Sequence, residues 1–140
     1  MRRAGPRDLA ALCTLNAQLD PNDAFTRRRL RALLLQGRVL IALAGKAPAG
    51  FCIVVPRGSG VSIHAIMVEP GLRRRGIGAH MLQRALVGAT IARCEIRAGN
   101  VVSEKLFLGA GFTPQSIKPR MYREGEAGIV MVRRNPKSRI

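Results

Sequence analysis

The residue types and spacing that best suggest chemistry lie in one stretch of the chain, residues 68–79, which reads VEPGLRRRGIGA. Gly76 and Gly78 carry no Cβ, so a ligand can approach the backbone closely there. If a helix begins at these glycines, its first N–H groups point outward at the positive end of the helix dipole. Such an end binds phosphate, and the three arginines of residues 73–75 add charge-assisted donors. We therefore expect an anion site here, the alternative being a capped helix with solvated arginines.

Other phosphate and metal motifs are not found in the sequence. The glycine stretch is not the dinucleotide fingerprint Gly-x-Gly-x-x-Gly, and no Gly-Lys-Ser/Thr of a P-loop follows it. Cys13, Cys52 and Cys94 lie far apart in apolar segments, without a Cys-x-x-Cys pair or a Cys/His cluster. We predict no metal site and three buried, reduced thiols that form no acyl-enzyme.

The elements that must position this stretch follow from the hydrophobic periodicity. Helical spacing predicts a helix from Leu9 to Leu19, and a second one that is capped by Asp23, includes Phe25 and stops at Gly37. The remaining elements are strands over 39–44, 50–55 and 61–68, a helix over 76–89, a strand over 91–97, a helix over 100–110 and two strands from residue 112 on, the last over 129–132. With one strand before the first helix, the expected order is βααβββαβαββ, which predicts an α/β fold with a mixed, mostly antiparallel sheet flanked by helices.

Length and composition predict one globular domain over residues 1–140, ending in a frayed basic tail over 133–140. Apolar residues make up 47% and charged residues 23%, as in folded rather than disordered chains. No apolar run approaches the roughly 20 residues that cross a bilayer, and residues 1–8 lack the apolar stretch of a signal peptide. We expect a cytoplasmic protein with no membrane partner.

The charge of the chain is unusual, because 24 lysines and arginines face 8 acidic residues, which gives a formal net charge of +16. A field of this sign attracts phosphates, nucleic acid and acidic protein surfaces. A nucleic-acid binder would also carry stacking aromatics, whereas this chain has no Trp, one Tyr and four Phe. The charge alone therefore does not predict a specific nucleic-acid partner, and an arginine-rich composition is the alternative explanation.

Two motifs together resemble those of the GNAT superfamily of acetyl-CoA-dependent N-acetyltransferases. The first is Arg-x-x-Gly-x-Gly at residues 73–78, after Val-x-Pro at residues 68–70, and the second is NVVSEKLFLGAGF at residues 100–112. The predicted element order also matches that fold, so the resemblance covers nearly the whole chain. It implies acetyl-CoA as co-substrate and no metal.

The resemblance assigns the cofactor-binding residues by position. Main-chain groups of the strand end would pair with the pantetheine arm, and the N–H groups after it would hold the pyrophosphate. Asn100 corresponds to an asparagine that contacts the cofactor in members of the family. The residues expected to bind the cofactor are Ile66, Met67, Val68, Arg73, Arg74, Arg75, Gly76, Ile77, Gly78, Ala79, Asn100 and Phe107.

Within the superfamily, the stretch CEIRAGN at residues 94–100 is similar to the branch that acetylates the N-terminal alanine of ribosomal proteins. That branch has a glutamate five residues before the asparagine, which implies that Glu95 is the general base for the amine. Strand alternation puts Glu95 and Arg97 on one face. The alternative for Glu95 is a half-buried ion pair with Arg97 or Arg93.

Three further residues bear on catalysis and substrate. In the family a tyrosine acts as general acid toward the leaving thiolate, but this chain has Phe107 at that position, which has no proton to donate. The same branch carries a tyrosine in its peptide site at the spacing of Tyr122, so Tyr122 is a candidate substrate residue. His64, on the predicted strand 61–68, is a second candidate. The alternatives are a strand tyrosine with a solvated hydroxyl and a histidine paired to a neighbour in the sheet.

We therefore expect an N-acetyltransferase that transfers the acetyl group of acetyl-CoA to a primary amine by direct attack in a ternary complex. The first expected acceptor is the N-terminal amine of a protein or peptide, and a small-molecule amine is the alternative. Because of Phe107, a non-catalytic acyl-CoA-binding or regulatory module remains a further alternative. The sequence leaves the acceptor and the oligomeric state open.

Overall fold

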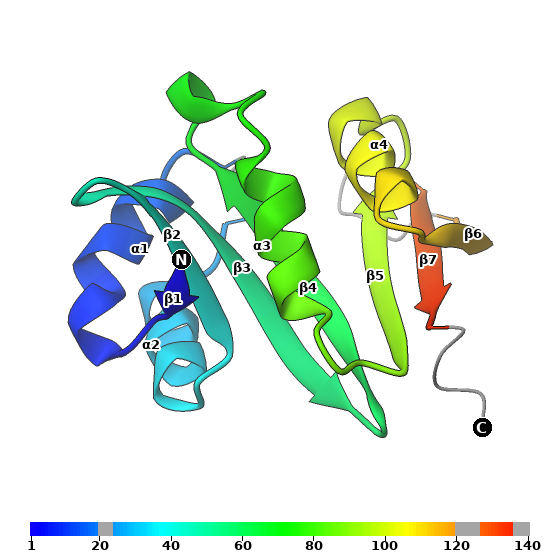
Figure 1. Cartoon of the computed structure of the whole chain (residues 1–140), viewed down its shortest axis with the longest axis horizontal. Helices are drawn as coiled ribbons and strands as arrows, with labels where there is room; N and C mark the ends of the chain where they lie inside the picture. The colour runs from blue at the N-terminus through cyan, green and yellow to red at the C-terminus, as the bar shows by residue number, and fades with distance from the viewer. Residues whose placement is uncertain (20–23, 120–126, 136–140) are drawn as a thin grey trace. The chain divides into compact units, whose positions relative to one another are not determined.

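The computed structural model describes residues 1–19, 24–119 and 127–135 (Figure 1). Its helices and strands follow one another in the predicted order, βααβββαβαββ. None of the helices in these ranges is long and apolar enough to cross a membrane. The elements are β1 (Arg2–Arg3), α1 (Leu9–Asn16), α2 (Arg27–Leu35), β2 (Val39–Ala44), β3 (Ala47–Arg57), β4 (Gly60–Val68), α3 (Ile77–Ala85), β5 (Ile91–Arg97), α4 (Val101–Gly109), β6 (Thr113–Lys118) and β7 (Gly128–Arg134), with short 3-10 helices at Pro6–Asp8 and Pro70–Leu72.

The strands pair in the order β1-β2-β3-β4-β5-β7-β6. β1 with β2, β2 with β3, β5 with β7 and β6 with β7 are antiparallel, whereas β4 and β5 are parallel where Val61–Ile63 lies opposite Ala92–Cys94. The predicted α/β fold with a mixed, mostly antiparallel sheet is thus confirmed. The chain divides into two compact units, an N-terminal unit (Met1–Val54 and Ala65–Ala85) and a C-terminal unit (Val55–His64 and Leu86–Ile140).

In the N-terminal unit, α1 and α2 pack against each other, and α3 contacts β2 (Figure 1). Leu30, Leu33 and Leu34 of α2 are buried. Their spacing of three and four residues makes the apolar stripe that the periodicity predicts. Arginines occupy the other positions of the first turns and are exposed, so α2 presents one apolar and one basic face.

Helix α2 begins later than predicted. Thr26 caps it, because its side chain accepts a hydrogen bond from the N–H of Arg29 at 3.1 Å. The predicted cap, Asp23, lies outside the described residues. Phe25, expected inside the helix, instead donates its N–H to the side-chain amide of Asn16 and accepts from it, at 2.9 and 2.7 Å. Since both main-chain groups of Phe25 are used there, the helix starts after it.

Two predicted boundaries later in the chain are also wrong. Helix α3 ends at Ala85 and not at residue 89. Arg133 and Arg134, expected in a frayed tail, are the last residues of β7 and pair with Ala92 and Ile91 of β5. The sequence did not indicate this pairing because the partner strand is distant along the chain. Residues 136–140 of the predicted tail lie outside the described residues.

The C-terminal unit shows the period of two that was predicted for β5. Ala92, Cys94 and Ile96 are buried, and the residues between them are half-buried and lie on the opposite face. Cys52 and Cys94 are buried as predicted, but Cys13 is only partly buried. Cys13 differs because its thiol lies at the surface of α1, 3.7 Å from the guanidinium group of Arg27.

Candidate functional site

The segment that was predicted to bind an anion contains two residues with a left-handed backbone. The 3-10 helix Pro70–Leu72 leads into a loop in which Arg74 and Gly76 both have positive φ, 66° and 77°. Left-handed residues in a loop turn successive N–H groups toward one side, where they form an anion-binding nest. Gly76 adopts this conformation without the steric cost of a Cβ, whereas Arg74 adopts it at a cost.

The start of α3 adds further donors to this loop. Its first hydrogen bond runs from the N–H of His80 to the carbonyl of Gly76, at 3.0 Å. The N–H groups of residues 77–79 precede it and have no partner within the helix. Residues 73–75 are exposed, and a Cβ built on Gly76 meets no described atom within 4 Å. Donors, open space and positive charge therefore fit a pyrophosphate.

The strand before this loop carries the residues expected to meet the pantetheine arm. Met67 is buried in the C-terminal half of β4, while Ile66 and Val68 are half-buried. Arg73 folds back onto the strand end, where its Nε donates a hydrogen bond of 3.4 Å to the carbonyl of Val68. The strand end and the anion-binding loop are thus linked by a side chain as well as by the chain itself.

Glu95 on β5 forms two ion pairs. Its Oε1 accepts from Nζ of Lys118 at 2.8 Å and from Nη2 of Arg93 at 3.0 Å, and the Glu95 side chain is 29% exposed. The ion pair with Arg93 was one of the alternatives from the sequence, whereas Lys118 was missed. The Lys118 ammonium, and next the Arg93 guanidinium, hold the pKa of Glu95 below its ordinary value. The carboxylate is therefore ionised at neutral pH, and its basicity is reduced.

Two other predicted cofactor residues have structural roles in the C-terminal unit. Asn100 caps α4, since its Oδ1 accepts a hydrogen bond from the N–H of Ser103 at 3.2 Å. Phe107 is only 3% exposed and packs edge-to-face on Phe112, with 5.1 Å between the ring centroids. Phe107 is therefore a core residue, and Asn100 is an exposed residue that positions the start of a helix.

The structure describes one of the two candidate substrate residues, His64. His64 is exposed on β4, and it follows Ile63, which lies opposite Cys94 in the parallel register. Alternation therefore places His64 on the same face as Glu95. Tyr122 lies outside the described residues, so its role stays a prediction. No group of three or more His, Cys, Asp or Glu side chains in the described ranges could hold a metal ion.

Comparisons with known proteins agree with these observations. A family model for the acetyltransferase (GNAT) domain matches residues 36–114. Over 74 residues the chain is 31% identical to an uncharacterized protein of Mycobacterium leprae (strain TN). That match covers 51% of this chain and 21% of the relative, so the chain spans about a fifth of the length of the curated protein it matches.

Solved structures share the fold at low sequence identity. The ribosomal-protein-S18-alanine N-acetyltransferase from Escherichia coli is 21% identical, with a TM-score of 0.80 over 91% of this chain and 88% of that one. Ard1 from Thermoplasma volcanium is 18% identical, with a TM-score of 0.85 over 95% of each chain. YncA, a putative acetyltransferase from Salmonella typhimurium solved with its cofactor acetyl-CoA, is 19% identical, with a TM-score of 0.79 over 95% of this chain and 91% of that one.

Proposed function

The chain belongs to the acetyltransferase (GNAT) family, and on this premise we propose that it transfers an acetyl group from acetyl-CoA directly to a primary amine. The proposal takes residues 1–140 as a single N-acetyltransferase domain. One observation carries it: the matched range contains a loop with two positive φ values, N–H groups that have no helical partner and exposed arginines. These are the features that a nucleotide pyrophosphate requires.

In this proposal the cofactor is held mainly by backbone groups. Acetyl-CoA supplies an activated acetyl thioester when bound. The N–H groups of residues 77–79, together with Arg74 and Arg75, hold its pyrophosphate. The main chain of residues 66–68 pairs with the pantetheine arm as an added strand would. Asn100 contributes its side-chain NH2 group, because only its Oδ1 is used in capping α4.

Glu95 acts as the base in the proposed reaction. An ammonium group has no lone pair, so a proton must leave before the nitrogen attacks. The cations contact Oε1 of Glu95, and Oε2 has no hydrogen-bond partner among the described residues. Glu95 takes the proton at Oε2, the nitrogen forms a bond to the acetyl carbon, and the carbon–sulfur bond breaks. Positioning of the amine supplies most of the remaining rate enhancement.

The leaving thiolate receives no proton from the position of the family tyrosine. Phe107 cannot donate one, and its ring is buried against Phe112. A coenzyme A thiol resembles a cysteine thiol, with a pKa of about 8.5, so its thiolate is a tolerable leaving group near neutral pH. We expect turnover that is slower than with a general acid, by a factor on the order of 100.

The acceptor that we propose is the N-terminal amine of a protein or peptide. The spacing of Glu95 and Asn100 supports this choice, because it resembles the branch that acetylates ribosomal proteins. The likeness in fold to the Escherichia coli ribosomal-protein-S18-alanine N-acetyltransferase adds support. A small primary amine is the second choice.

A non-catalytic acyl-CoA-binding or regulatory module is the second candidate function. Two observations favour it, the buried phenyl ring of Phe107 and the two cations that lower the basicity of Glu95. Such a module would keep the anion-binding loop and have no turnover. It therefore makes the same prediction for cofactor binding and a different one for acetyl transfer.

The two candidates are separated by titration calorimetry with acetyl-CoA, followed by assay of thiol release on a mixed panel of peptides and small amines. If the protein is an enzyme, we expect acetyl-CoA to bind and coenzyme A thiol to be released with at least one amine. Glu95→Gln should then slow thiol release at least about 100-fold at neutral pH, while the affinity for acetyl-CoA stays within twofold. Glu104→Gln on α4 is the matched control and should keep the wild-type rate. Unchanged turnover in Glu95→Gln would exclude Glu95 as base, and binding without release on any amine would favour the module.

A further inference from the structure

A β-bulge decides which side chains share a face with Glu95. The register of β6 on β7 shifts within residues 114–116, so one residue of β6 has no partner. After the shift, Lys118 lies opposite Gly128, two residues from Val130, which is the β7 partner of Glu95. Without the bulge, alternation from the start of β6 would place Lys118 on the other face. The bulge therefore brings Lys118 to the carboxylate of Glu95.

This face, which we call the Glu95 face, carries more positive than negative charge. Arg93 and Lys118 both contact Glu95, and their side chains are 26% and 48% exposed. Arg134 shares the face because it is an even number of residues from Val130 on β7. Arg134 is exposed and forms no ion pair within the described ranges. With Arg97, which alternation also places on this face, the face has four cations against one described carboxylate.

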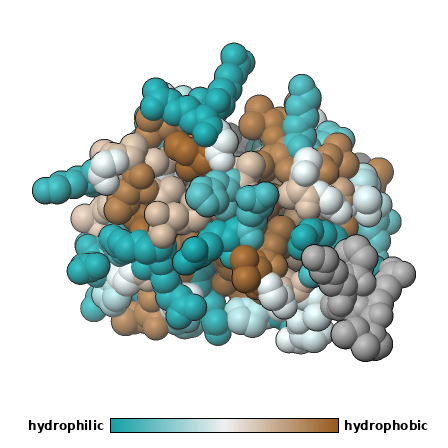
Figure 2. All heavy atoms as spheres, viewed as in Figure 1, coloured by the Kyte–Doolittle hydropathy of each residue, from teal (hydrophilic) through white to brown (hydrophobic). Residues whose placement is uncertain are grey.

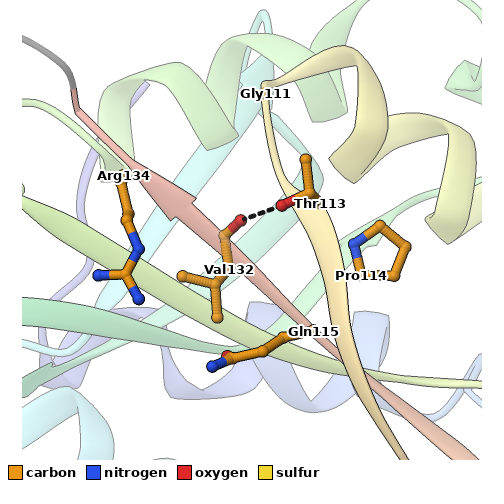
Figure 3. Close-up of a pocket in the computed structure, with 6 residues that line it drawn as sticks. All are labelled: Gly111, Thr113, Pro114, Gln115, Val132 and Arg134. Carbon is orange, nitrogen blue, oxygen red and sulfur yellow. Dashed lines mark hydrogen bonds between the residues drawn. The ribbon is translucent and has the colours of Figure 1, made fainter.

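A hollow of about 320 Å³ lies where β6 begins and β7 ends (Figure 3). In Figure 3 the side chains of Arg134, Val132 and Gln115 extend to one side of the strands, and the ring of Pro114 lies apart from them. Gln115 is the residue that the bulge leaves without a partner. The hydroxyl of Thr113 donates to the carbonyl of Val132 at 3.4 Å. The hollow therefore offers a guanidinium and an amide as hydrogen-bond donors.

We propose that the Glu95 face binds an acidic peptide that carries the acceptor amine, with carboxylates of the peptide at Lys118 and Arg93 and in the Arg134 hollow. The inference rests on the proposed function, because that function places the amine at Glu95. The cations on this face repel polyamines and other cationic acceptors and attract carboxylates. Glu95 keeps one carboxylate oxygen for the amine, while its cationic neighbours select what accompanies that amine.

The spacing along β7 gives the proposal a register. Val130, opposite Glu95, and Arg134 are four residues apart, or about 13 Å at the rise of a β-strand. An extended peptide has the same rise. If its amine lies at Glu95, an acidic second residue lies near Arg93 and Lys118, and an acidic fourth or fifth residue lies at Arg134. Acidic side chains at these positions should thus contribute separately.

A peptide fits this face better than a nucleic acid does. Single-stranded nucleic acids are held by aromatic side chains on which the bases stack, together with a basic groove. The described residues of the face and hollow include no Phe, Tyr or Trp, and the apolar side chains that line the hollow are those of Pro114 and Val132. Donors spaced along an extended strand match carboxylates on an extended chain.

The test compares four free-amine peptides that carry Glu or Gln at the second or the fourth position and are otherwise neutral. At low salt we expect each Glu to lower KM by about three- to fivefold with little change in kcat, as for an exposed ion pair. Arg134→Gln should abolish the effect at the fourth position and keep that at the second. Arg57→Gln, which removes one charge from the exposed end of β3, is the matched control and should keep both.

The same four peptides are titrated against the protein with coenzyme A present, so that binding is measured apart from turnover. Equal affinities for Glu and Gln peptides, or equal behaviour of Arg134→Gln and Arg57→Gln, would overturn the inference. Tighter binding of the Glu peptides than of the Gln peptides, without acetylation of any peptide, would retain the inference and overturn the proposed function. A single-stranded RNA oligonucleotide is tested as a competitor. If it displaces the Glu peptides, binds more tightly than they do and loses affinity in Arg134→Gln, the face would be assigned to nucleic acid instead.

Discussion

At the scale of single residues, the candidate functional side chains also have structural partners. Asn100 caps a helix, Phe107 packs in the core, and Glu95 holds two cations. A motif position therefore does not separate a catalytic role from a structural one. For Glu95 the contacts matter chemically, because two cations on Oε1 keep the carboxylate ionised and make it a weaker base.

The three cysteines give a prediction at this scale. Burial raises the pKa of Cys52 and that of Cys94 to about 12, while Cys13 is partly exposed beside Arg27. Because the thiolate is the reactive form, we expect a thiol reagent at pH 8 to label Cys13 at least about 100-fold faster than the other two. Intact-mass spectrometry over time measures this. Cys13→Ser should show no fast phase, and fast labelling of two sites would contradict the structure.

At the scale of elements, short deviations from regular structure position the functional groups. The bulge in β6 sets the face of Lys118, and the two left-handed residues before α3 shape the anion-binding loop. The backbones of β4 and β5 also approach each other closely at Gly60, where a Cβ would overlap the carbonyl oxygen of Ile91. Regular strands and helices make up most of the fold, and these irregular positions shape the candidate site.

The loop before α3 can be tested with two identical changes at different glycines. Gly76 has a φ of 77°, so Gly76→Ala should cost about 1 kcal/mol of stability and weaken acetyl-CoA binding by about tenfold as the nest distorts. Gly109, the last residue of α4, has open space around it and is the control. Gly109→Ala should stabilise by about 0.5–1 kcal/mol and leave acetyl-CoA affinity unchanged. Urea denaturation and calorimetry measure both effects, and equal affinities would argue against the loop as the cofactor site.

The start of the chain gives a second test at this scale. Arg2 donates two hydrogen bonds of 2.8 Å to Asp8, and the N–H of Gly5 donates a third. The Arg2 guanidinium is the main cause that lowers the pKa of Asp8 to about 2. A carboxyl with a lowered folded pKa stabilises the fold above about pH 4, and this contribution is lost as the pH falls through about 2.

Asp8→Asn should therefore cost about 1–3 kcal/mol at pH 7 and flatten the loss of stability between pH 4 and pH 2. Urea denaturation at a series of pH values measures this. Arg2→Met should have a similar effect, and the double variant should be less destabilised than the sum of the two changes, since both remove one interaction. Additive effects would show that Arg2 and Asp8 act independently.

At the scale of the whole chain, the excess of arginine sets the electrostatics. On the face that Figure 2 shows, hydrophilic side chains project over much of the surface, with hydrophobic ones between them. A net charge of +16 favours every anionic ligand to some degree. Specificity must then come from local features, and in our proposals these are the loop before α3 for the cofactor and the Glu95 face for the acceptor.

This long-range attraction predicts a salt effect on cofactor binding. Between about 50 and 500 mM NaCl, we expect the Kd for acetyl-CoA to rise by about tenfold as the field is screened. Arg75→Gln should weaken binding at low salt and show a smaller rise, whereas Arg57→Gln should follow the wild type. Calorimetry at a series of salt concentrations measures this, and a Kd that does not depend on salt would show that charge has no part in binding.

Local sequence patterns determined the order of the elements and the glycine loop. The period of two in β5 and the leucine spacing of α2 are properties of neighbouring residues, and both were confirmed. The helix ends were predicted less accurately. Thr26 caps α2, whereas Asp23 was predicted to do so, and the position of Phe25 depends on its hydrogen bonds to Asn16. These errors have a common cause, because a cap depends on contacts that periodicity does not include.

The pairing of distant strands was decided only by the tertiary structure. The sequence favoured Arg97 or Arg93 as the partner of Glu95, and it could not indicate Lys118, which needs both the β7 register and a bulge. It placed Arg134 in a tail, whereas the pairing of β7 with β5 puts it beside a hollow. The physical reason is that a shift of one residue in register exchanges the faces of a strand, and no local pattern specifies that shift.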